Sequence, residues 1–418
     1  MKQIKIQGGH ILRGEIPISG AKNGAVALVP ASLLCDETVT IDNIPDISDI
    51  AALNEILEYL GATVTRDGAT MTICSEKIEC RAIPEDISKK LRASYYFMSA
   101  MLGKFKQVEM YFPGGCSIGA RPIDQTLKAF IALGAEVIED GDRYTITAKE
   151  LKGAHIYLDV PSVGATINAI FAAVKATGKT IIENAAKEPE IVSIATFLNN
   201  MGAKITGVGT SKITIQGVSY LHGGFTEVIP DRIEAGTYLL AGALIGDHVR
   251  VTNMIPKHLE ALLLKLEEIG YELEVGTDYV EISAIEQRKP VKITTLGYPG
   301  FATDLQQPIT VLLTQCNGDS FVEETIYENR FGHIPHLNHM GANIEYQKRT
   351  VTVHGKTNLH GHKVEATDLR AGASMILAGL VAEGETTITS IEHVLRGYEH
   401  ILEKLRRVGA KIELEEIN

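Results

Sequence analysis

Six glycines at nearly equal intervals constrain the fold of this chain more than any other feature of its sequence. Each glycine ends an amphipathic, helix-like segment, and successive sites are 68 to 73 residues apart. Such a fixed period indicates an internal repeat. A glycine at this place typically ends a helix in the left-handed conformation. The six sites are Gly61, Gly134, Gly202, Gly270, Gly341 and Gly409.

Each repeat has the same content. An apolar helix rich in small residues comes first, followed by a β-branched strand, an amphipathic helix that ends at the glycine, and short closing strands. A helix that is apolar on all sides must be buried, whereas an amphipathic helix covers a surface. The sequence therefore predicts an α/β fold of six βαβαββ-type units. We expect the buried helices at residues 24–34, 93–102, 165–176, 236–245, 308–315 and 371–382.

The repeats also predict two globules, each with three apolar helices at its centre. This division agrees with the chain length of 418 residues. We expect the first globule at 22–229, and the second at 1–21 together with 230–418. The first residues join the second globule in this prediction because they resemble the strands that close a repeat.

Charge and composition exclude several functions. A net charge of −12 argues against a general nucleic-acid binder but leaves room for a local cationic site. The five cysteines form no C-x-x-C pair, which favours reduced thiols in a cytoplasm. Met1 to Lys5 resembles no signal peptide, and no uncharged apolar run is long enough to span a membrane. We therefore expect a cytoplasmic protein with no membrane partner.

A glycine-rich loop around Cys116 interrupts the second repeat. The helix stop at Gly134 comes 22 positions after the end of the strand at Phe112, against 17 to 19 positions in four other repeats. An extension in one copy is more often functional than architectural. A thiol with Arg121 nearby can transfer a proton or attack an electrophile. The alternative is a surface turn with an incidental cysteine.

Charged residues gather at the starts of the apolar helices. A cation there opposes the helix dipole, and an anionic ligand would explain its presence. A solvated or salt-bridged side chain is the alternative for each one. The candidate cations for phosphate or carboxylate are Lys22, Arg92, Arg121, Arg370 and Arg396.

Three aspartates stand at similar positions. Asp231, Asp304 and Asp368 can each cap a helix or act as a base toward a substrate hydroxyl. His333, His336 and His339 recur every three residues, but one helix face cannot present all three, so a metal site is the less favoured hypothesis.

Eight motifs in order along the chain resemble those of the UDP-N-acetylglucosamine 1-carboxyvinyltransferase family. The 113–122 motif, which contains the cysteine loop, is the most specific. The motifs occupy residues 19–23, 113–122, 162–166, 230–234, 303–306, 328–331, 368–370 and 396–398.

The resemblance implies a two-domain inside-out α/β barrel. It also implies transfer of the enolpyruvyl group of phosphoenolpyruvate to the 3′-hydroxyl of UDP-N-acetylglucosamine, with release of phosphate. This is the first committed step of peptidoglycan synthesis. The two substrates are the expected partners, with neither a cofactor nor a metal.

The resemblance assigns residues to roles. Cys116 matches the proton donor and the thiol that fosfomycin alkylates, and Asp304 matches the carboxylate at the sugar hydroxyl; Lys22 and Arg396 complete the catalytic set. Asp231, Asp368 and Arg370 are expected to support the site. The phosphoenolpyruvate contacts are Lys22, Asn23, Arg121 and Arg396. The nucleotide-sugar contacts are Arg92, Arg121, Pro122, Ile123, Asp124, Gln125, Ser162, Val163, Gly164, Asp304 and Ile326.

Three positions depart from the family pattern. Some members have lysine in place of Ser48 and Val160, and proline is usual at Ala302. These differences concern nucleotide affinity and loop packing. Two rival hypotheses are the sister transferase acting on shikimate 3-phosphate, whose usual Gly-Ser-Lys-Ser pattern is replaced here at 20–23, and a nucleotide-sugar-binding regulator with little catalysis.

Overall fold

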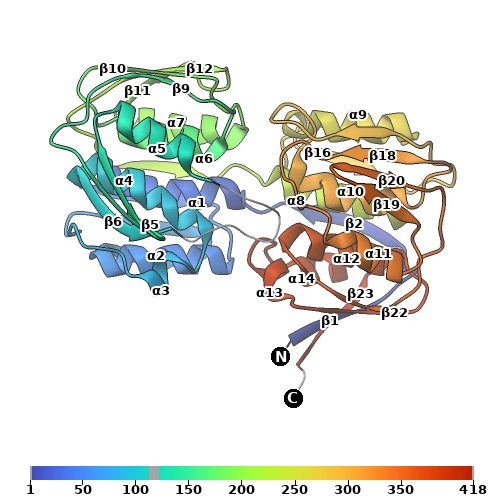
Figure 1. The fold of residues 1–418 in the computed structure, drawn as a ribbon. Helices are drawn as coiled ribbons and strands as arrows, with labels where there is room; N and C mark the ends of the chain where they lie inside the picture. The colour runs from blue at the N-terminus through green and yellow to red at the C-terminus, as the bar shows by residue number, and fades with distance from the viewer. Residues whose placement is uncertain (1, 113–121, 417–418) are drawn as a thin grey trace. The chain divides into compact units, whose positions relative to one another are not determined.

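The computed structural model describes residues 2–112 and 122–416 (Figure 1). These residues form two compact units, which we treat separately. The Lys22 unit consists of residues 20–112 and 122–229, and the Asp304 unit consists of residues 2–19 and 230–416. None of the described helices is both long enough and apolar enough to cross a bilayer.

The Lys22 unit alternates helices with short strands. Its helices, with the 3-10 turns denoted η, are α1 (Lys22–Ala31), η1 (Ser32–Leu34), α2 (Ser48–Leu60), α3 (Glu85–Ser88), η2 (Arg92–Tyr95), α4 (Tyr96–Phe105), α5 (Asp124–Ala132), α6 (Val163–Ala173) and α7 (Pro189–Asn200). Its strands are β3 (Thr38–Asp42), β4 (Thr63–Asp67), β5 (Thr70–Cys74), β6 (Gln107–Tyr111), β7 (Glu136–Asp140), β8 (Arg143–Thr147), β9 (His155–Tyr157), β10 (Lys179–Glu183), β11 (Lys204–Thr206), β12 (Lys212–Gln216) and β13 (Gly224–Glu227).

The predicted apolar helices make the core of the Lys22 unit. α4 contacts both α1 and α6, and every residue of α6 from Ala165 to Ala173 is buried. Burial of each large apolar side chain contributes about 1.5–3 kcal/mol, so these helices supply much of the hydrophobic stabilisation. In contrast, α2, α5 and α7 bury one face each, as their amphipathic sequences predict.

The Asp304 unit repeats this plan. Its helices and 3-10 turns are α8 (Arg232–Ile245), η3 (Pro256–Leu259), α9 (Glu260–Ile269), η4 (Thr303–Leu305), α10 (Gln306–Leu313), α11 (His333–His339), α12 (Leu369–Val381), α13 (Glu392–Leu395) and α14 (Ile401–Arg407). Its strands are β1 (Lys2–Gln7), β2 (Leu12–Pro17), β14 (Gly246–Thr252), β15 (Glu274–Val275), β16 (Tyr279–Ile282), β17 (Lys292–Thr294), β18 (Ser320–Glu323), β19 (Ile344–Gln347), β20 (Thr350–Val353), β21 (Lys363–Glu365), β22 (Glu385–Thr389) and β23 (Lys411–Glu416).

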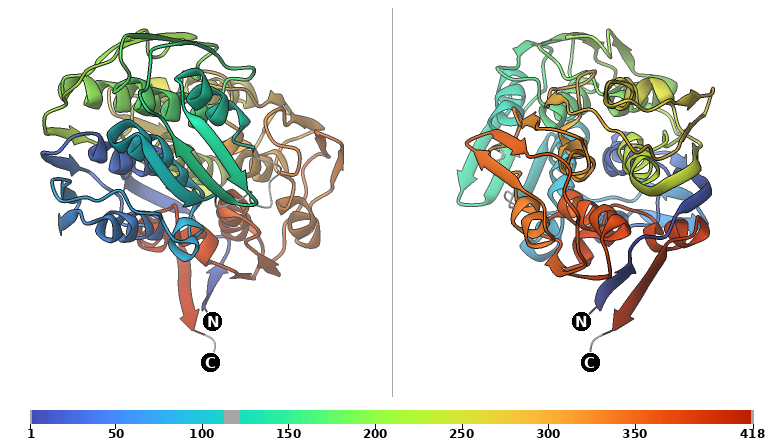
Figure 2. Two further views of the ribbon diagram at one scale, coloured as in Figure 1. Left: turned by 60° about the vertical axis from the view of Figure 1, so that its left-hand side comes forward. Right: turned by 90° about the vertical axis from the view of Figure 1, so that its right-hand side faces the viewer.

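In the Asp304 unit, α8, α10 and α12 contact one another and are almost entirely buried. The first residues complete the sheets of this unit, because β1 pairs between β22 and β23 and β2 pairs with β14. Figure 2 shows the strands that carry the two chain ends, β1 and β23, side by side. The N-terminal segment therefore closes repeats that lie far away in the sequence.

The described strands form six small sheets, three in each unit. Their orders are β13-β3-β5-β4, β6-β8-β7 and β11-β12-β10-β9 in the Lys22 unit, and β15-β16-β14-β2, β17-β18-β20-β19 and β21-β22-β1-β23 in the Asp304 unit. Each four-stranded sheet joins one parallel pair to two antiparallel pairs; the parallel pairs are β13–β3, β9–β10, β2–β14, β17–β18 and β21–β22.

The predicted helix stops are confirmed. All six repeat glycines have φ between 95° and 121°, and each lies within two residues of the end of an amphipathic helix. This backbone region favours glycine because it has no Cβ. The repeat inferred from the sequence is therefore a repeat of structure.

Candidate functional site

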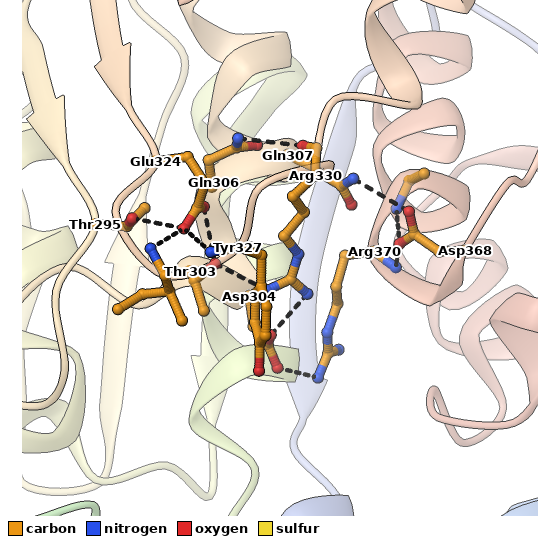
Figure 3. Close-up of polar contacts among 12 residues, drawn as sticks. Thr295, Thr303, Asp304, Gln306, Gln307, Glu324, Tyr327, Arg330, Asp368 and Arg370 are labelled. Carbon is orange, nitrogen blue, oxygen red and sulfur yellow. Dashed lines mark hydrogen bonds and ion pairs between the residues drawn. The ribbon is translucent and has the colours of Figure 1, made fainter. Parts of the chain in front are cut away.

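Asp304 lies in η4, immediately before the buried helix α10. Its Oδ1 forms an ion pair with Arg330 Nη2 at 2.8 Å, and its Oδ2 accepts a hydrogen bond from Arg370 Nη2 at 3.0 Å (Figure 3). The arginine side chains are 5% and 4% exposed, whereas that of Asp304 is 24% exposed. The carboxylate thus reaches solvent from between two buried cations.

These cations determine the charge of Asp304. Burial acts to raise its pKa, but Arg330 and Arg370 outweigh burial and hold the pKa of this carboxyl well below its usual range. The group is therefore an ionised hydrogen-bond acceptor. It is a poor base while both guanidiniums remain in contact with it.

The helix-cap alternative separates the three aspartates. Asp231 caps α8 by accepting from the backbone amides of Ile233 and Glu234, and Asp368 caps α12 through those of Arg370 and Ala371. Neither η4 nor α10 has a side-chain cap within the described residues. Asp304 thus differs from the other two, because its carboxylate contacts two arginines and caps neither η4 nor α10.

Arg370 and Asp368 extend the cluster around Asp304. The Arg370 guanidinium lies 5.2 Å from the ring centroid of Tyr398. Asp368 Oδ2 accepts a hydrogen bond from Gln307 Nε2 at 3.2 Å. Asp368 therefore links α12, the helix that it caps and that carries Arg370, to Gln307 of α10.

Two further predicted residues of the Asp304 unit lie on loops. Ile326 is 39% exposed, and its backbone amide donates to Glu324 Oε1 at 2.8 Å. Arg396 directly follows α13 and is half-buried. The structure thus links Ile326 to Glu324 through its backbone.

In the Lys22 unit, Lys22 is the first residue of α1. Its Nζ forms an ion pair with Asp49 Oδ2 at 3.0 Å, and both side chains are largely buried. Asn23 follows and is exposed. A lysine at a helix start strengthens the positive end of the dipole, which suits an anion.

Three of the predicted nucleotide-sugar segments lie near one another in this unit. The Arg92 guanidinium lies 4.9 Å from the Phe112 ring centroid and 5.8 Å from that of Tyr95. Gly164 follows Val163 in the first turn of α6, and a Cβ at Gly164 would lie only 1.5 Å from the Tyr95 hydroxyl oxygen. Glycine is therefore required there by close packing.

The start of α5 is tied to the loop before α6. Gln125 accepts from the backbone amide of Asp159 at 2.7 Å and donates to its carboxylate at 3.0 Å. Ser162 caps α6 by accepting from the Ala165 amide. Of the neighbouring predicted residues, Ile123 is buried, and Pro122 and Asp124 are exposed.

Cys116 and Arg121, the centre of the predicted acid chemistry, lie outside the described residues. The histidine series occupies α11, with His333 buried, His336 half-buried and His339 exposed. Within residues 2–112 and 122–416, no group of three His, Cys, Asp or Glu side chains is arranged to hold a metal.

The site residues missed in the sequence are Arg330 and Glu324. Arg330 belongs to the 328–331 motif, but its partner Asp304 is 26 positions away, and no local signal connects them. Glu324 has a signal, because burial alternates along β18 and Ser320 and Val322 point inward. Period two places Glu324 on the same buried face.

Comparisons with known proteins identify the family of this chain. The family described as EPSP synthase (3-phosphoshikimate 1-carboxyvinyltransferase) matches residues 6–405. A relative named UDP-N-acetylglucosamine 1-carboxyvinyltransferase 2, from Oceanobacillus iheyensis, is 53% identical over 417 residues, covering 100% of this chain and 97% of its own length. A relative of the same name from Staphylococcus aureus is 52% identical over 415 residues, covering 99% of both chains.

Solved structures have the same fold. The crystal structure of the enolpyruvyl transferase NikO from Streptomyces tendae matches with a TM-score of 0.91 at 26% identity, over 100% of this chain and 99% of that one. An EPSP synthase from Acinetobacter baumannii matches with a TM-score of 0.77 at 16% identity, over the full length of both chains. The predicted two-domain α/β fold is confirmed. The chain belongs to the EPSP synthase family and, within it, to the UDP-N-acetylglucosamine 1-carboxyvinyltransferases.

Proposed function

We propose that the protein transfers the enolpyruvyl group of phosphoenolpyruvate to the 3′-hydroxyl of UDP-N-acetylglucosamine and releases phosphate. The observation that carries this proposal is the 53% identity, over the whole chain, with a relative named for that activity. The product places the enzyme at the first committed step of peptidoglycan synthesis. We assign the reaction to the cytoplasm, because both substrates are multiply charged and do not cross membranes unaided.

The chemistry needs an acid and an acceptor for the hydroxyl proton. A proton adds to the methylene carbon of phosphoenolpyruvate while the sugar oxygen bonds to its C2 and loses its own proton. Loss of a proton from the new methyl group then expels phosphate and restores the double bond. Positioned side chains supply such steps without a cofactor.

Asp304 is suited to bind the 3′-hydroxyl of the sugar and to accept its proton. Its ionised, partly exposed carboxylate can orient the 3′-hydroxyl by accepting its hydrogen bond. Because two guanidiniums weaken it as a base, we infer that it takes the proton only as the new C–O bond makes the oxygen strongly acidic. Arg330 and Arg370 hold the carboxylate in place for this step.

The remaining assignments follow the sequence motifs. We propose that Cys116 donates the proton to the methylene carbon, and that Lys22, Asn23, Arg121 and Arg396 hold phosphoenolpyruvate. The position of Lys22 at the start of α1 supports an anion-binding role.

For UDP-N-acetylglucosamine, the packing of Arg92 and Gly164 around Tyr95 supports a shared binding region on the Lys22 unit. Ser162 begins the helix that contains Gly164, and Gln125 is hydrogen-bonded to the loop before it.

Phosphate release tests the proposed reaction. With phosphoenolpyruvate present, we expect release with UDP-N-acetylglucosamine and none above background with shikimate 3-phosphate. The reverse specificity would assign the chain to the sister reaction. Turnover equal to that of a Cys116→Ala variant would instead favour a binding protein without catalysis.

A carboxylic acid can replace the thiol as a proton donor. Cys116→Asp should therefore retain part of the turnover while losing alkylation by fosfomycin. Mass spectrometry of the treated variant checks the second expectation, and continued alkylation would assign the drug to another thiol.

A further inference from the structure

One position recurs at the end of the first strand of each repeat. In three repeats it is an asparagine with φ of 54° to 57°: Asn43, Asn184 and Asn253. Each donates its side-chain amide to the carbonyl oxygen just beyond the parallel neighbouring strand, at 2.7–2.8 Å. This contact joins adjacent repeats and is architectural.

The fifth repeat has Glu324 at this position. The parallel register pairs Thr294 with Glu323, just as it pairs Glu227 with Asp42 in the first repeat, so Glu324 is the counterpart of Asn43. Glu324 lacks the positive φ of the asparagines. Its side chain is completely buried and accepts hydrogen bonds where its counterparts donate them.

The two carboxylate oxygens of Glu324 have different partners. Oε1 accepts from Thr295 Oγ1 at 2.9 Å and from the amides of Ile326 and Tyr327 at 2.8 and 3.2 Å. Oε2 accepts from Thr303 Oγ1 at 2.8 Å (Figure 3). One buried side chain thus holds the loop with Ile326 and the turn with Asp304.

The contact with Thr303 continues to Asp304. Arg330 Nη1 donates to Thr303 Oγ1 at 2.9 Å while its Nη2 contacts Asp304 Oδ1 at 2.8 Å. A guanidinium can only donate, so the Thr303 hydroxyl must direct a lone pair at Arg330 and its own hydrogen at Glu324. Glu324 therefore fixes the hydroxyl that orients the arginine beside Asp304.

We propose that Glu324 is a positioning residue that sets Asp304 and the Ile326 loop in register for the acceptor sugar, an inference that rests on the proposed function. A position that is architectural in three other repeats thus supports the site in the fifth repeat. Such outer partners commonly affect activity 10- to 100-fold where the groups they hold need defined geometry.

Replacement by glutamine preserves the shape but cannot satisfy these partners. If the amide oxygen faces the two backbone amides, the new NH₂ group faces Thr303, whose hydroxyl hydrogen then has no acceptor. If the amide is reversed, its NH₂ faces those two donors. Either orientation leaves buried polar hydrogens unpaired, and this disturbs the chain from Thr303 to Asp304.

The primary test compares Glu324→Gln with Glu323→Gln. Glu323 is the preceding residue on β18, and its side chain is 45% exposed. Its carboxylate makes two long contacts, an ion pair with Lys292 at 3.9 Å and a hydrogen bond accepted from Thr294 Oγ1 at 3.4 Å. We expect Glu324→Gln to lower kcat/KM for UDP-N-acetylglucosamine about 10- to 100-fold, with KM for phosphoenolpyruvate within about twofold of wild type. Values within about twofold of the Glu323→Gln variant for both substrates would overturn the proposal.

A second pair of variants keeps the proposal testable if Glu324→Gln fails to fold. Thr303→Val removes the hydroxyl at nearly constant shape, whereas Thr303→Ser retains it. We expect the valine variant to lose kcat/KM for the sugar and the serine variant to recover most of it. Equal losses in both variants would show that packing, and not the hydroxyl, matters.

The wild type separates this inference from the proposed function. If it releases phosphate with shikimate 3-phosphate only, the proposed function fails, and the same variants are then compared with that acceptor. A selective loss of acceptor kcat/KM would still support positioning by Glu324, and unchanged values would reject it.

Discussion

Two carboxylates of the Asp304 unit, those of Asp304 and Glu234, show how similar groups come to have opposite pKa shifts. Each lies at the start of a core helix and each contacts a cation. Asp304 has two arginines and a side chain that is 24% exposed. Glu234 contacts one ammonium group, because Lys404 Nζ lies 2.5 Å from its Oε1, and its side chain is 3% exposed.

The difference appears in their protonation. Burial raises the pKa of Glu234 to about 7 although Lys404 opposes it. At Asp304 the effect of burial is outweighed by two guanidiniums, which lower the pKa. The number of fixed cations and the access to solvent thus decide which carboxylate is ionised and can meet a ligand.

The largest expected effect follows from removing the charge of Asp304. Asp304→Asn leaves Arg330 and Arg370 buried without their shared counter-charge, so we expect a loss of about 3 kcal/mol in the free energy of unfolding. Turnover should fall about 10²- to 10⁴-fold, because the acceptor for the hydroxyl proton is weakened. Urea unfolding and initial rates of phosphate release measure the two effects.

An exposed aspartate of the same unit provides the control. Asp319→Asn should change neither quantity appreciably, since the Asp319 side chain is 52% exposed. If Asp304→Asn kept the turnover of the wild type, Asp304 would have no role in the proton transfer.

His333 extends the comparison to a titratable side chain that is completely buried. Neither ring nitrogen has a hydrogen-bond partner among the described residues, and burial lowers the pKa of His333 to about 3. The unfolded chain binds this proton near pH 6.5, so stability should fall as pH falls from about 6.5 to about 3, by up to about 1.4 kcal/mol per pH unit.

In the variant His333→Leu, the free energy of unfolding should depend less on pH between about pH 6.5 and about pH 3. Urea unfolding at several pH values in this range measures the slope. His339→Leu, at an exposed position of α11, should leave the slope as it is. An unchanged slope in His333→Leu would mean that the buried imidazole is protonated in the native state.

The smallest effect concerns Glu234. Its raised pKa means that the native state binds more protons than the unfolded state between about pH 4.5 and about pH 7, so stability falls as pH rises through this window. Glu234→Gln removes this component of the slope, in the opposite direction to His333. Unfolding titrations at several pH values, with exposed Glu267→Gln as the control, measure it. A parallel shift of the whole curve would contradict the assignment.

The sequence predicts the framework better than the contacts of the site. The helix stops at Gly61 and its five counterparts follow from local backbone chemistry, which the sequence displays directly. The contact between Asp304 and Arg370 does not follow from local chemistry, because the two residues are 66 positions apart. The packing of α10 against α12 brings them together. The change from asparagine to Glu324 is visible in the sequence, but its partners are not.

The most direct test of the proposed reaction is to run it in heavy water and analyse the product by NMR and mass spectrometry. Addition and elimination exchange a hydrogen at the methylene carbon. The account therefore predicts one phosphate released for each enolpyruvyl-UDP-N-acetylglucosamine formed, with deuterium in its vinyl group. A product without vinyl deuterium would contradict the mechanism, and the absence of this product would contradict the function.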